Sequence, residues 1–374
     1  MAPTWGTSPA FDAALAEVAR RAGEFTRRRH VPRDVVDKFR LAGFYRATTP
    51  KRFGGDARPP AEFLRMVERM SEVDGSAGWV ASFGASGVYL AALPPETQER
   101  LYADGPDLVF AGALFPVQPA EEVPGGFRVR GQWRLASGCL AADYLGVGIG
   151  PGGAGRPRTA VLPAARAEVV ETWDAVGMRG TGSHDLRVDD VVVPAEWTFV
   201  RGGGSTIDEP LYRYPALAYA SQVLAVVNVG IARAALNHVT AFGAGRAGLT
   251  GGPVLADRAY ARIALAKAEA DLRSVRAFFY EVTEEAWEAA SEGTPGPEQV
   301  SLLRLAAAHA ARVGFDVVRA AYTLGGTSAI EADHPLQRHL RDAAVVPQHA
   351  FLTEAMYDAA GAVFLSAQPF PGYL

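Results

Sequence analysis

Four short segments of this chain hold the side chains best suited to bind a ligand or to do chemistry. They combine serine and threonine hydroxyls, a histidine, an Arg-Asp pair, and glycines that let a backbone approach a ligand closely. The segments are Leu41–Ala77, Gly131–Asp143, Val176–Pro194 and Leu324–Asp342. His349 follows the last of them, and an imidazole suits proton transfer near working pH because its unperturbed pKa is about 6.5. The alternative for His349 is a capping or core histidine after Pro347.

Several common kinds of site are missing from the sequence. No G-x-G-x-x-G or G-x-x-x-x-G-K-[ST] motif occurs, so the sequence does not predict a Rossmann or P-loop nucleotide fold. No His, Asp and Glu cluster has the spacing of metal ligands, and we therefore expect no metal. The single cysteine, Cys139, excludes an internal disulfide framework and a cysteine-based zinc or iron–sulfur site.

Composition limits the partners of the chain. Its 374 residues include 37 Lys and Arg against 41 Asp and Glu, a net charge of −4 that does not indicate nucleic-acid binding. The first twenty residues lack the basic start and apolar stretch of a signal peptide. The uncharged run Gly75–Pro95 contains four glycines and three serines, which favours a buried helix over a membrane span. We expect a soluble cytoplasmic protein.

The hydrophobic period divides the chain into three zones and predicts an α+β fold. Residues 11–102 have helical spacing, whereas residues 108–200 form short alternating runs typical of a small sandwich or barrel. Helical spacing then returns in four long stretches, Ala216–Phe242, Pro253–Glu292, Glu298–Leu324 and Leu336–Leu365, which predict a bundle. The expected domains are a helical domain at 1–107, a β-barrel domain at 108–205 and a four-helix bundle at 206–374.

In order, spacing and placement, the four segments resemble the acyl-CoA dehydrogenase superfamily over essentially the whole chain. The resemblance implies the same three domains, in the same order, and usually a homotetramer. It also implies a flavin between the barrel and the bundle, partly completed by a neighbouring subunit.

The resemblance assigns flavin contacts to residues in three of the segments. Ser137, at the end of a strand, matches the position whose hydroxyl or backbone contacts flavin N5, although an ordinary turn serine is the alternative. Gly138 would let the backbone approach the ring. The other predicted flavin-binding residues are Ser183, Gly325, Gly326, Thr327 and, as a phosphate contact, Arg246. FAD and FMN both remain open, with FAD weakly favoured.

The chain departs from the dehydrogenases where they carry a catalytic carboxylate. The glutamate that usually follows Arg-Asp-Ala falls on or near Ala350, and no acidic residue occurs between Glu209 and Asp257. His349 occupies the region instead, which resembles the group D flavin monooxygenases. In that branch a separate reductase supplies reduced flavin, which reacts with molecular oxygen to give a C4a-hydroperoxide.

The resemblance therefore implies a monooxygenase that acts on a small aromatic or heteroatom-bearing substrate. His349 is the predicted catalytic base, and Ser137 is predicted to protect the N5 edge. Trp79, Phe83 and His184 are the predicted lining of the substrate pocket. Core packing is the alternative for the two aromatic residues, and a turn role is the alternative for His184.

Three other functions stay open at this point. The same flavin chemistry would serve N-oxygenation of an amine, as in relatives of the nitrososynthases. A true acyl-CoA dehydrogenase would need a displaced base, for which Glu354 is the nearest candidate. A relative without activity could bind flavin or an acyl carrier as a structural partner, but Ser137 and the Gly325-Gly326 pair argue for retained flavin binding.

Overall fold

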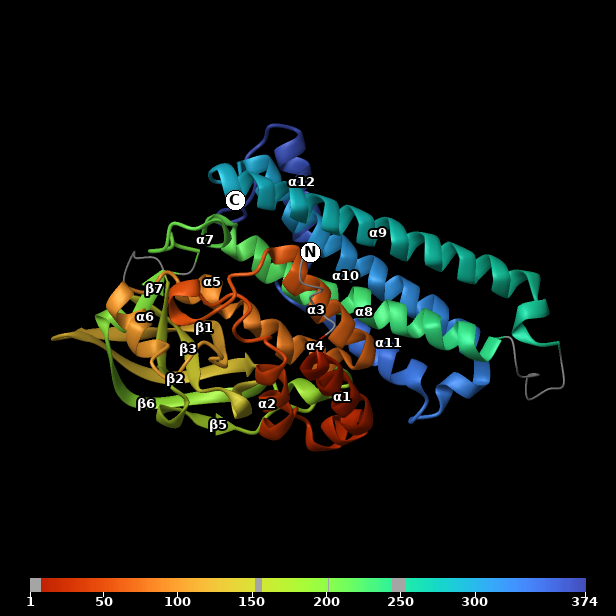
Figure 1. Cartoon of the computed structure of the whole chain (residues 1–374), viewed down its shortest axis with the longest axis horizontal. Helices are drawn as coiled ribbons and strands as arrows, with labels where there is room; N and C mark the ends of the chain where they lie inside the picture. Colours follow the sequence, from red (N-terminus) through yellow and green to blue (C-terminus); the bar gives the residue numbers. More distant parts are fainter. Residues whose placement is uncertain (1–7, 152–156, 201, 244–252) are drawn as a thin grey trace.

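The computed structural model describes residues 8–151, 157–200, 202–243 and 253–374, so the predicted phosphate contact Arg246 lies outside the described residues. Figure 1 shows the strands gathered on one side and the long helices extending to the other, with α3 and α4 between them. This is the α+β arrangement that the sequence predicts.

Residues 9–101 fold mainly into helices, as their period predicts. These are α1 (Pro9–Arg28), α2 (Arg33–Leu41), α3 (Pro60–Val73), α4 (Gly75–Ala81), the 3-10 helix η2 (Ser82–Ala85), α5 (Ser86–Leu90) and α6 (Pro95–Leu101). Ser8 caps α1 by accepting a hydrogen bond from the backbone N–H of Phe11, and Asp74 caps α4 by accepting one from Ala77. The uncharged run Gly75–Pro95 is largely buried against other helices.

Seven strands form one mixed sheet in the order β5-β6-β2-β1-β3-β4-β7. They are β1 (Phe110–Val123), β2 (Gly126–Ala136), β3 (Tyr144–Pro151), β4 (Arg158–Pro163), β5 (Glu168–Val170), β6 (His184–Pro194) and β7 (Thr198–Val200). β1 and β3 are parallel and the other neighbours are antiparallel. β1, β2 and β6 are longer than the short runs predicted, because shifts of register allow long strands to bend.

The described residues from Pro210 onward form mostly long helices around α8. They are α7 (Pro210–Arg213), α8 (Ala216–Gly243), α9 (Ala259–Glu292), α10 (Pro297–Gly325), α11 (Pro335–Val345) and α12 (Ala355–Phe364). α8 packs against α3, α10 and α11, and most of its residues are buried. Among the described residues α8 is the one helix long and apolar enough to cross a membrane, and 72% of its most apolar 18-residue window is buried inside the protein.

Two helix boundaries differ from the prediction. α9 begins at Ala259 rather than at Pro253, and the predicted single helix Leu336–Leu365 is broken after α11. The break occurs at Pro347, which has no N–H to donate to the carbonyl of Ala343 one turn earlier. The side-chain amide of Asn228 on α8 donates to that carbonyl instead, at 3.0 Å. The 3-10 helix η9 (Val346–Gln348) and a turn then lead to α12.

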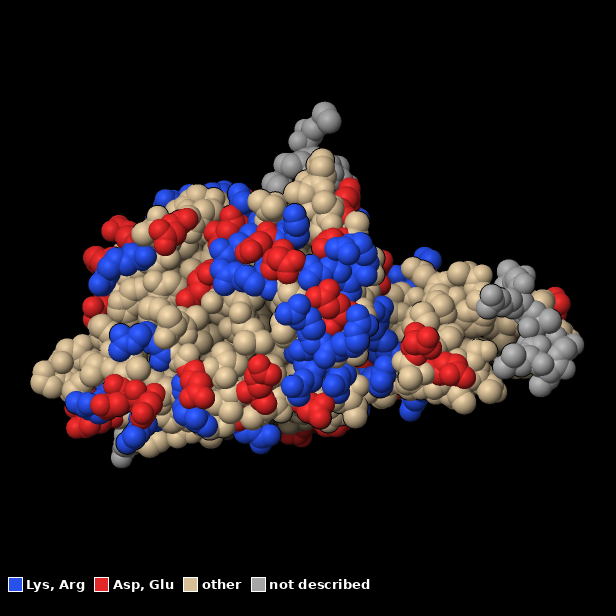
Figure 2. All heavy atoms as spheres, turned by 90° about the horizontal axis from the view of Figure 1, so that it is seen from below, with Lys and Arg blue, Asp and Glu red and all other residues tan. Residues whose placement is uncertain are grey.

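Charges of both signs mix on the surface. Figure 2 shows one face of the molecule, on which Lys and Arg gather near the middle, over the region of α1, with Asp and Glu among them. On α1, Arg21 forms ion pairs with Glu17 and Glu24, and Arg28 forms one with Glu24. The Arg21 side chain is only 13% exposed, and these pairs join neighbouring turns of one helix, so the patch is an ion-paired helix surface.

A buried histidine on α11 makes stability depend on pH. Burial first, and then the cationic Arg338 and the neighbouring His238 and His334, lower the pKa of His339 to about 3. Because this pKa lies below that of the unfolded chain, about 6.5, the stabilisation is present above pH 6.5 and is lost as the pH falls toward 3. We expect the free energy of unfolding to fall less between pH 7 and pH 5 in His339→Gln than in the wild type, as measured by urea denaturation. Equal slopes in the two proteins would contradict this assignment.

Candidate active site

Ser137 sits where β2 leaves the sheet through a bulge. The register of β2 against β6 shifts between Trp133 and Ala136, and Leu135 inside this shift has a left-handed backbone with φ 66°. Gly138, with φ 72°, is also left-handed, and its N–H donates to the carbonyl of Thr181 at 2.8 Å. These two turns flank Ser137 and direct it toward the loop between β5 and β6, where it is buried.

Three hydroxyl groups form a hydrogen-bonded chain whose direction can be derived. Thr181 Oγ1 donates to the carbonyl of Met178 at 2.8 Å, and because a hydroxyl has one hydrogen it must accept from Ser183 Oγ at 2.7 Å. Ser183 then accepts from Ser137 Oγ at 2.6 Å. Ser137 in turn accepts from Trp79 Nε1 at 3.2 Å. No further donor to this hydroxyl is seen among the described residues, so the second lone pair of Ser137 can accept from one more N–H.

Trp79 connects this chain to His349. The ring centroids of Trp79 and His349 are 5.9 Å apart in an edge-on arrangement, and those of His349 and Phe351 are 5.1 Å apart. His349 is half-buried and follows η9 with an extended backbone, because the helix breaks at Pro347. Its Nδ1 accepts from the backbone N–H of Phe351 at 3.3 Å, so the neutral imidazole carries its proton on Nε2.

Phe83 lies beside the same strand end. A Cβ placed on Gly138 would lie 3.6 Å from the Phe83 ring, so the glycine leaves space along this aromatic face. The structure therefore brings together six of the predicted site residues: Trp79, Phe83, Ser137, Gly138, Ser183 and His349. They come from the N-terminal helices, the sheet and the last helical stretch.

His184 is held differently. It is almost fully buried, and its Nδ1 accepts from the backbone N–H of Trp173 at 3.1 Å. Burial is the main cause that lowers its pKa, so the ring is neutral near pH 7. No hydrogen bond among the described residues joins His184 to Ser137 or to His349, and its place in the substrate pocket stays a prediction.

Gly325, Gly326 and Thr327 lie away from this cluster. Gly325 ends α10, and Gly326 and Thr327 begin the 3-10 helix Gly326–Ile330. The whole of α11, 11 residues or about 16 Å of helix, separates them from the segment of His349. Gly326 has φ 58°, and a Cβ on Gly325 would lie 2.7 Å from Ala329 Cβ. Within one subunit this pair is therefore required by the turn itself, and its flavin contact stays a prediction.

The candidate displaced base, Glu354, is an exposed surface residue. Its side chain is 75% exposed, and it forms an ion pair with Arg312 of α10. A carboxylate that is open to solvent and paired with an arginine lacks the protected surroundings in which a base removes a proton from a carbon acid.

Sequence reasoning missed two residues of this site. Thr181 lies in the segment Val176–Pro194, but only the fold shows that it accepts from Ser183. Asp342 belongs to the Arg-Asp pair of the segment Leu324–Asp342, and the fold places its carboxylate against the backbone N–H of Met178. Hydrogen bonds between residues 164 positions apart leave no local signal in a sequence.

Comparison with known families agrees with this architecture. The model of the acyl-CoA dehydrogenase N-terminal domain matches residues 10–103, and that of the acyl-CoA dehydrogenase C-terminal domain matches residues 222–354. An indole-3-acetate monooxygenase of Pseudomonas putida is 55% identical over 98% of this chain and 96% of its own. The chain belongs to the acyl-CoA dehydrogenase superfamily.

Other relatives place the chain among the oxygenases of this superfamily. An indole-3-acetate monooxygenase of Acinetobacter baumannii is 45% identical over 97% of this chain and 95% of its own. The flavin-dependent monooxygenase, oxygenase subunit HsaA, of Mycobacterium tuberculosis is 29% identical over 91% of this chain and 90% of its own. The crystal structure of the HsaA monooxygenase from M. tuberculosis aligns with a TM-score of 0.89 at 26% identity, covering 98% of both chains. This acyl-CoA dehydrogenase relative is a flavin-dependent monooxygenase.

The residues at the strand end fit a reduced flavin. A flavin is a flat apolar ring with polar edges, and N5 of its reduced form carries an N–H donor. The available lone pair of Ser137 suits such a donor, and the missing side chain of Gly138 leaves room beside Phe83. Leu135, two residues before Ser137, adds an apolar side chain that is 57% exposed.

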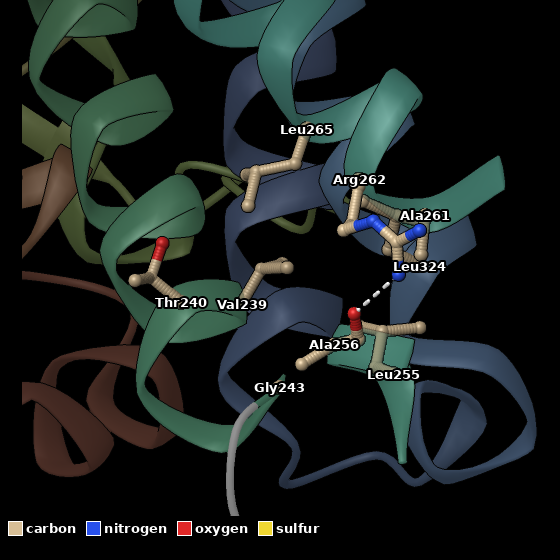
Figure 3. Close-up of a pocket in the computed structure, with 9 residues that line it drawn as sticks. All are labelled: Val239, Thr240, Gly243, Leu255, Ala256, Ala261, Arg262, Leu265 and Leu324. Carbon is tan, nitrogen blue, oxygen red and sulfur yellow. Dashed lines mark hydrogen bonds between the residues drawn. The ribbon is translucent and has the colours of Figure 1, made fainter. Parts of the chain in front are cut away.

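A separate cavity of about 230 Å³ lies at the other end of the bundle, between α8, α9 and α10 (Figure 3). Its lining consists of Val239, Thr240, Gly243, Leu255, Ala256, Ala261, Arg262, Leu265 and Leu324. Arg262 Nη1 donates to the carbonyl of Ala256 at 2.8 Å across its edge. None of the six clustered site residues lines this cavity.

Removing the acceptor of the Ser137 hydroxyl should uncouple oxygen use from product formation. In Ser183→Ala the Ser137 O–H loses its partner and can turn toward the flavin edge, where it competes as a donor. Loss of one hydrogen bond corresponds to roughly a tenfold change, so we expect hydrogen peroxide released per oxygen consumed to rise severalfold, measured with an oxygen electrode and a peroxide assay. Ser221→Ala is the matched control, because Ser221 is a buried serine on α8 that donates to Leu217. If both variants release the same amount of peroxide per oxygen consumed, the chain of hydroxyl groups has no such role.

Proposed function

We propose that this enzyme inserts one atom of molecular oxygen into an indole-type aromatic acid, with indole-3-acetate as the leading candidate. The two indole-3-acetate monooxygenases at 55% and 45% identity support this substrate class. The observation that carries the assignment is the contact of His349 with Trp79, which hydrogen-bonds to Ser137. The indole ring of Trp79 thus lies between the His349 imidazole and Ser137, the serine whose lone pair suits the flavin.

The site residues on the two sides of Trp79 have different proposed roles. On one side Ser137 accepts a hydrogen bond from the flavin edge, while Trp79 and Ser183 hold its hydroxyl in that orientation. When bound, the reduced flavin supplies the electrons that activate molecular oxygen. On the other side His349 holds a proton at Nε2, so it donates a hydrogen bond to the substrate or to the oxygen being transferred. A base role would require the bond between His349 Nδ1 and Phe351 to break first.

The same comparison supports a proposal about the partners of the enzyme. Because HsaA is named as an oxygenase subunit, we propose that a separate reductase supplies the reduced flavin, with FAD and FMN to be compared by titration. We also propose a cytoplasmic homotetramer. Gly325 and Thr327 lie too far along the bundle to complete the site of their own subunit, and Tyr260 and Ile263 on α9 are apolar and more than half exposed. Light scattering on a sizing column tests the tetramer.

Removal of the imidazole tests the proposed chemistry. Supplied with chemically reduced flavin, oxygen and indole-3-acetate, the wild type should form an oxygenated indole product, detected by mass spectrometry. His349→Asn should lower product formation about a hundredfold, the usual effect of losing a general acid or base, while flavin binding measured by fluorescence stays nearly unchanged.

His309→Asn is the control for this variant, because His309 is a half-buried histidine that contacts Tyr357 outside the site. Full activity of His349→Asn would remove that residue from the mechanism. Reduction of bound oxidised flavin by an acyl-CoA, without any reductase, would instead identify a dehydrogenase.

A further inference from the structure

Asp342 on α11 joins the helical bundle to the loop that carries the hydroxyl chain. Its carboxylate is buried, and Oδ1 accepts from the backbone N–H of Met178 at 2.5 Å. The loop lies directly on the helix here, since a Cβ placed on Gly177 would lie 2.0 Å from the carbonyl oxygen of Arg341. This contact therefore depends on both a glycine and a carboxylate.

Met178 is the strained point of the loop. Its backbone is left-handed, with φ 51° and ψ 32°, a conformation that is unfavourable for a side chain of this size. Asp342 holds its N–H, and the hydroxyl of Thr181 and the indole N–H of Trp173 donate to its carbonyl at 2.8 and 3.3 Å. Because the Thr181 hydroxyl donates to the Met178 carbonyl, this carbonyl also sets the direction of the hydrogen-bonded chain from Ser137 to Thr181.

The charges around Asp342 come from two helices. Asp74, the buried cap of α4, faces it, and Arg338 and Arg341 lie on its own helix. Arg338 contacts the Asp74 carboxylate at 3.5 Å. Burial and then the Asp74 carboxylate raise the pKa of Asp342 to about 7, although the Met178 N–H and the two arginines favour ionisation. Asp342 thus changes charge within the working range of an enzyme.

We propose that Asp342 is a positioning residue, which sets the orientation of the Ser137 hydroxyl by holding the Met178 N–H and does so more firmly when it is ionised. An ionised carboxylate is the stronger acceptor, so the loop is held more tightly above about pH 7 and more loosely below it. The effect on catalysis rests on the proposed function, whereas the effect on the loop does not.

Two substitutions separate the acceptor from its charge. Asp342→Asn keeps the size and an acceptor oxygen but does not ionise, and Asp342→Leu removes the acceptor. Asp107→Asn is the matched control, because Asp107 is a half-buried carboxylate paired with Arg46, away from the site. If Asp342→Leu fails to fold, Asp342→Asn alone decides the outcome.

The first measurement uses the protein without flavin or substrate. Hydrogen–deuterium exchange of the peptide that contains Met178 is compared between each variant and the wild type at the same pH. We expect exchange in Asp342→Asn to match the wild type at pH 6 and to be severalfold faster at pH 8, and exchange in Asp342→Leu to be faster at both. Exchange that stays in constant ratio between Asp342→Asn and the wild type from pH 6 to pH 8 would overturn the proposal.

The second measurement follows oxygen use with chemically reduced flavin. In the wild type and in Asp107→Asn the peroxide released per oxygen should fall severalfold between pH 6 and pH 8, and in Asp342→Asn it should stay high. The same pH dependence of peroxide release in Asp342→Asn and in the wild type would also overturn the positioning role. Absence of any oxygenated product from the wild type would reject the proposed function instead, while the exchange experiment would still test Asp342.

Discussion

The left-handed backbone of Met178 is the point on which the site depends. A non-glycine residue in this conformation costs on the order of 1–3 kcal/mol and persists only where its surroundings hold it. Here the bundle holds its N–H through Asp342, and the loop holds its carbonyl through Thr181 and Trp173. Because both groups are occupied, the hydroxyl chain that begins at this carbonyl has one direction, and Ser137 at its end keeps a lone pair for a ligand.

Two other local departures from regular structure serve the same site. The bulge at Leu135 turns the end of β2 toward the loop, and the break at Pro347 ends the bundle helix early enough to place His349 beside Trp79. The break is tolerated because Asn228 satisfies the carbonyl that the proline leaves without a helical donor. A long regular strand and a long regular helix would have carried both side chains past the site.

The acyl-CoA dehydrogenases and this chain share a fold but differ at the position where the dehydrogenases carry their catalytic base. The dehydrogenase reaction needs a carboxylate base in a protected site, and this chain has alanine or histidine where that base is expected. A histidine whose Nδ1 is occupied presents Nε2–H, which suits donation to an oxygen atom rather than removal of a proton from carbon. The fold is retained, while the residue at the position expected for the base differs.

The sequence alone determined the fold class and the zones of helix and strand, because the hydrophobic period is a local property of a chain. Ser137 and His349 were predicted as site residues through the resemblance to a known superfamily, and their roles stay predictions. The sequence did not predict the break at Pro347, since a proline can also kink a continuous helix, nor the length of the strands, which depends on bulges. Only the tertiary structure decided that Trp79 links the two residues and that Asp342 holds the loop. Those contacts join positions at least 58 residues apart, and the hydrogen-bonding needs of buried polar groups are settled only when the elements pack together.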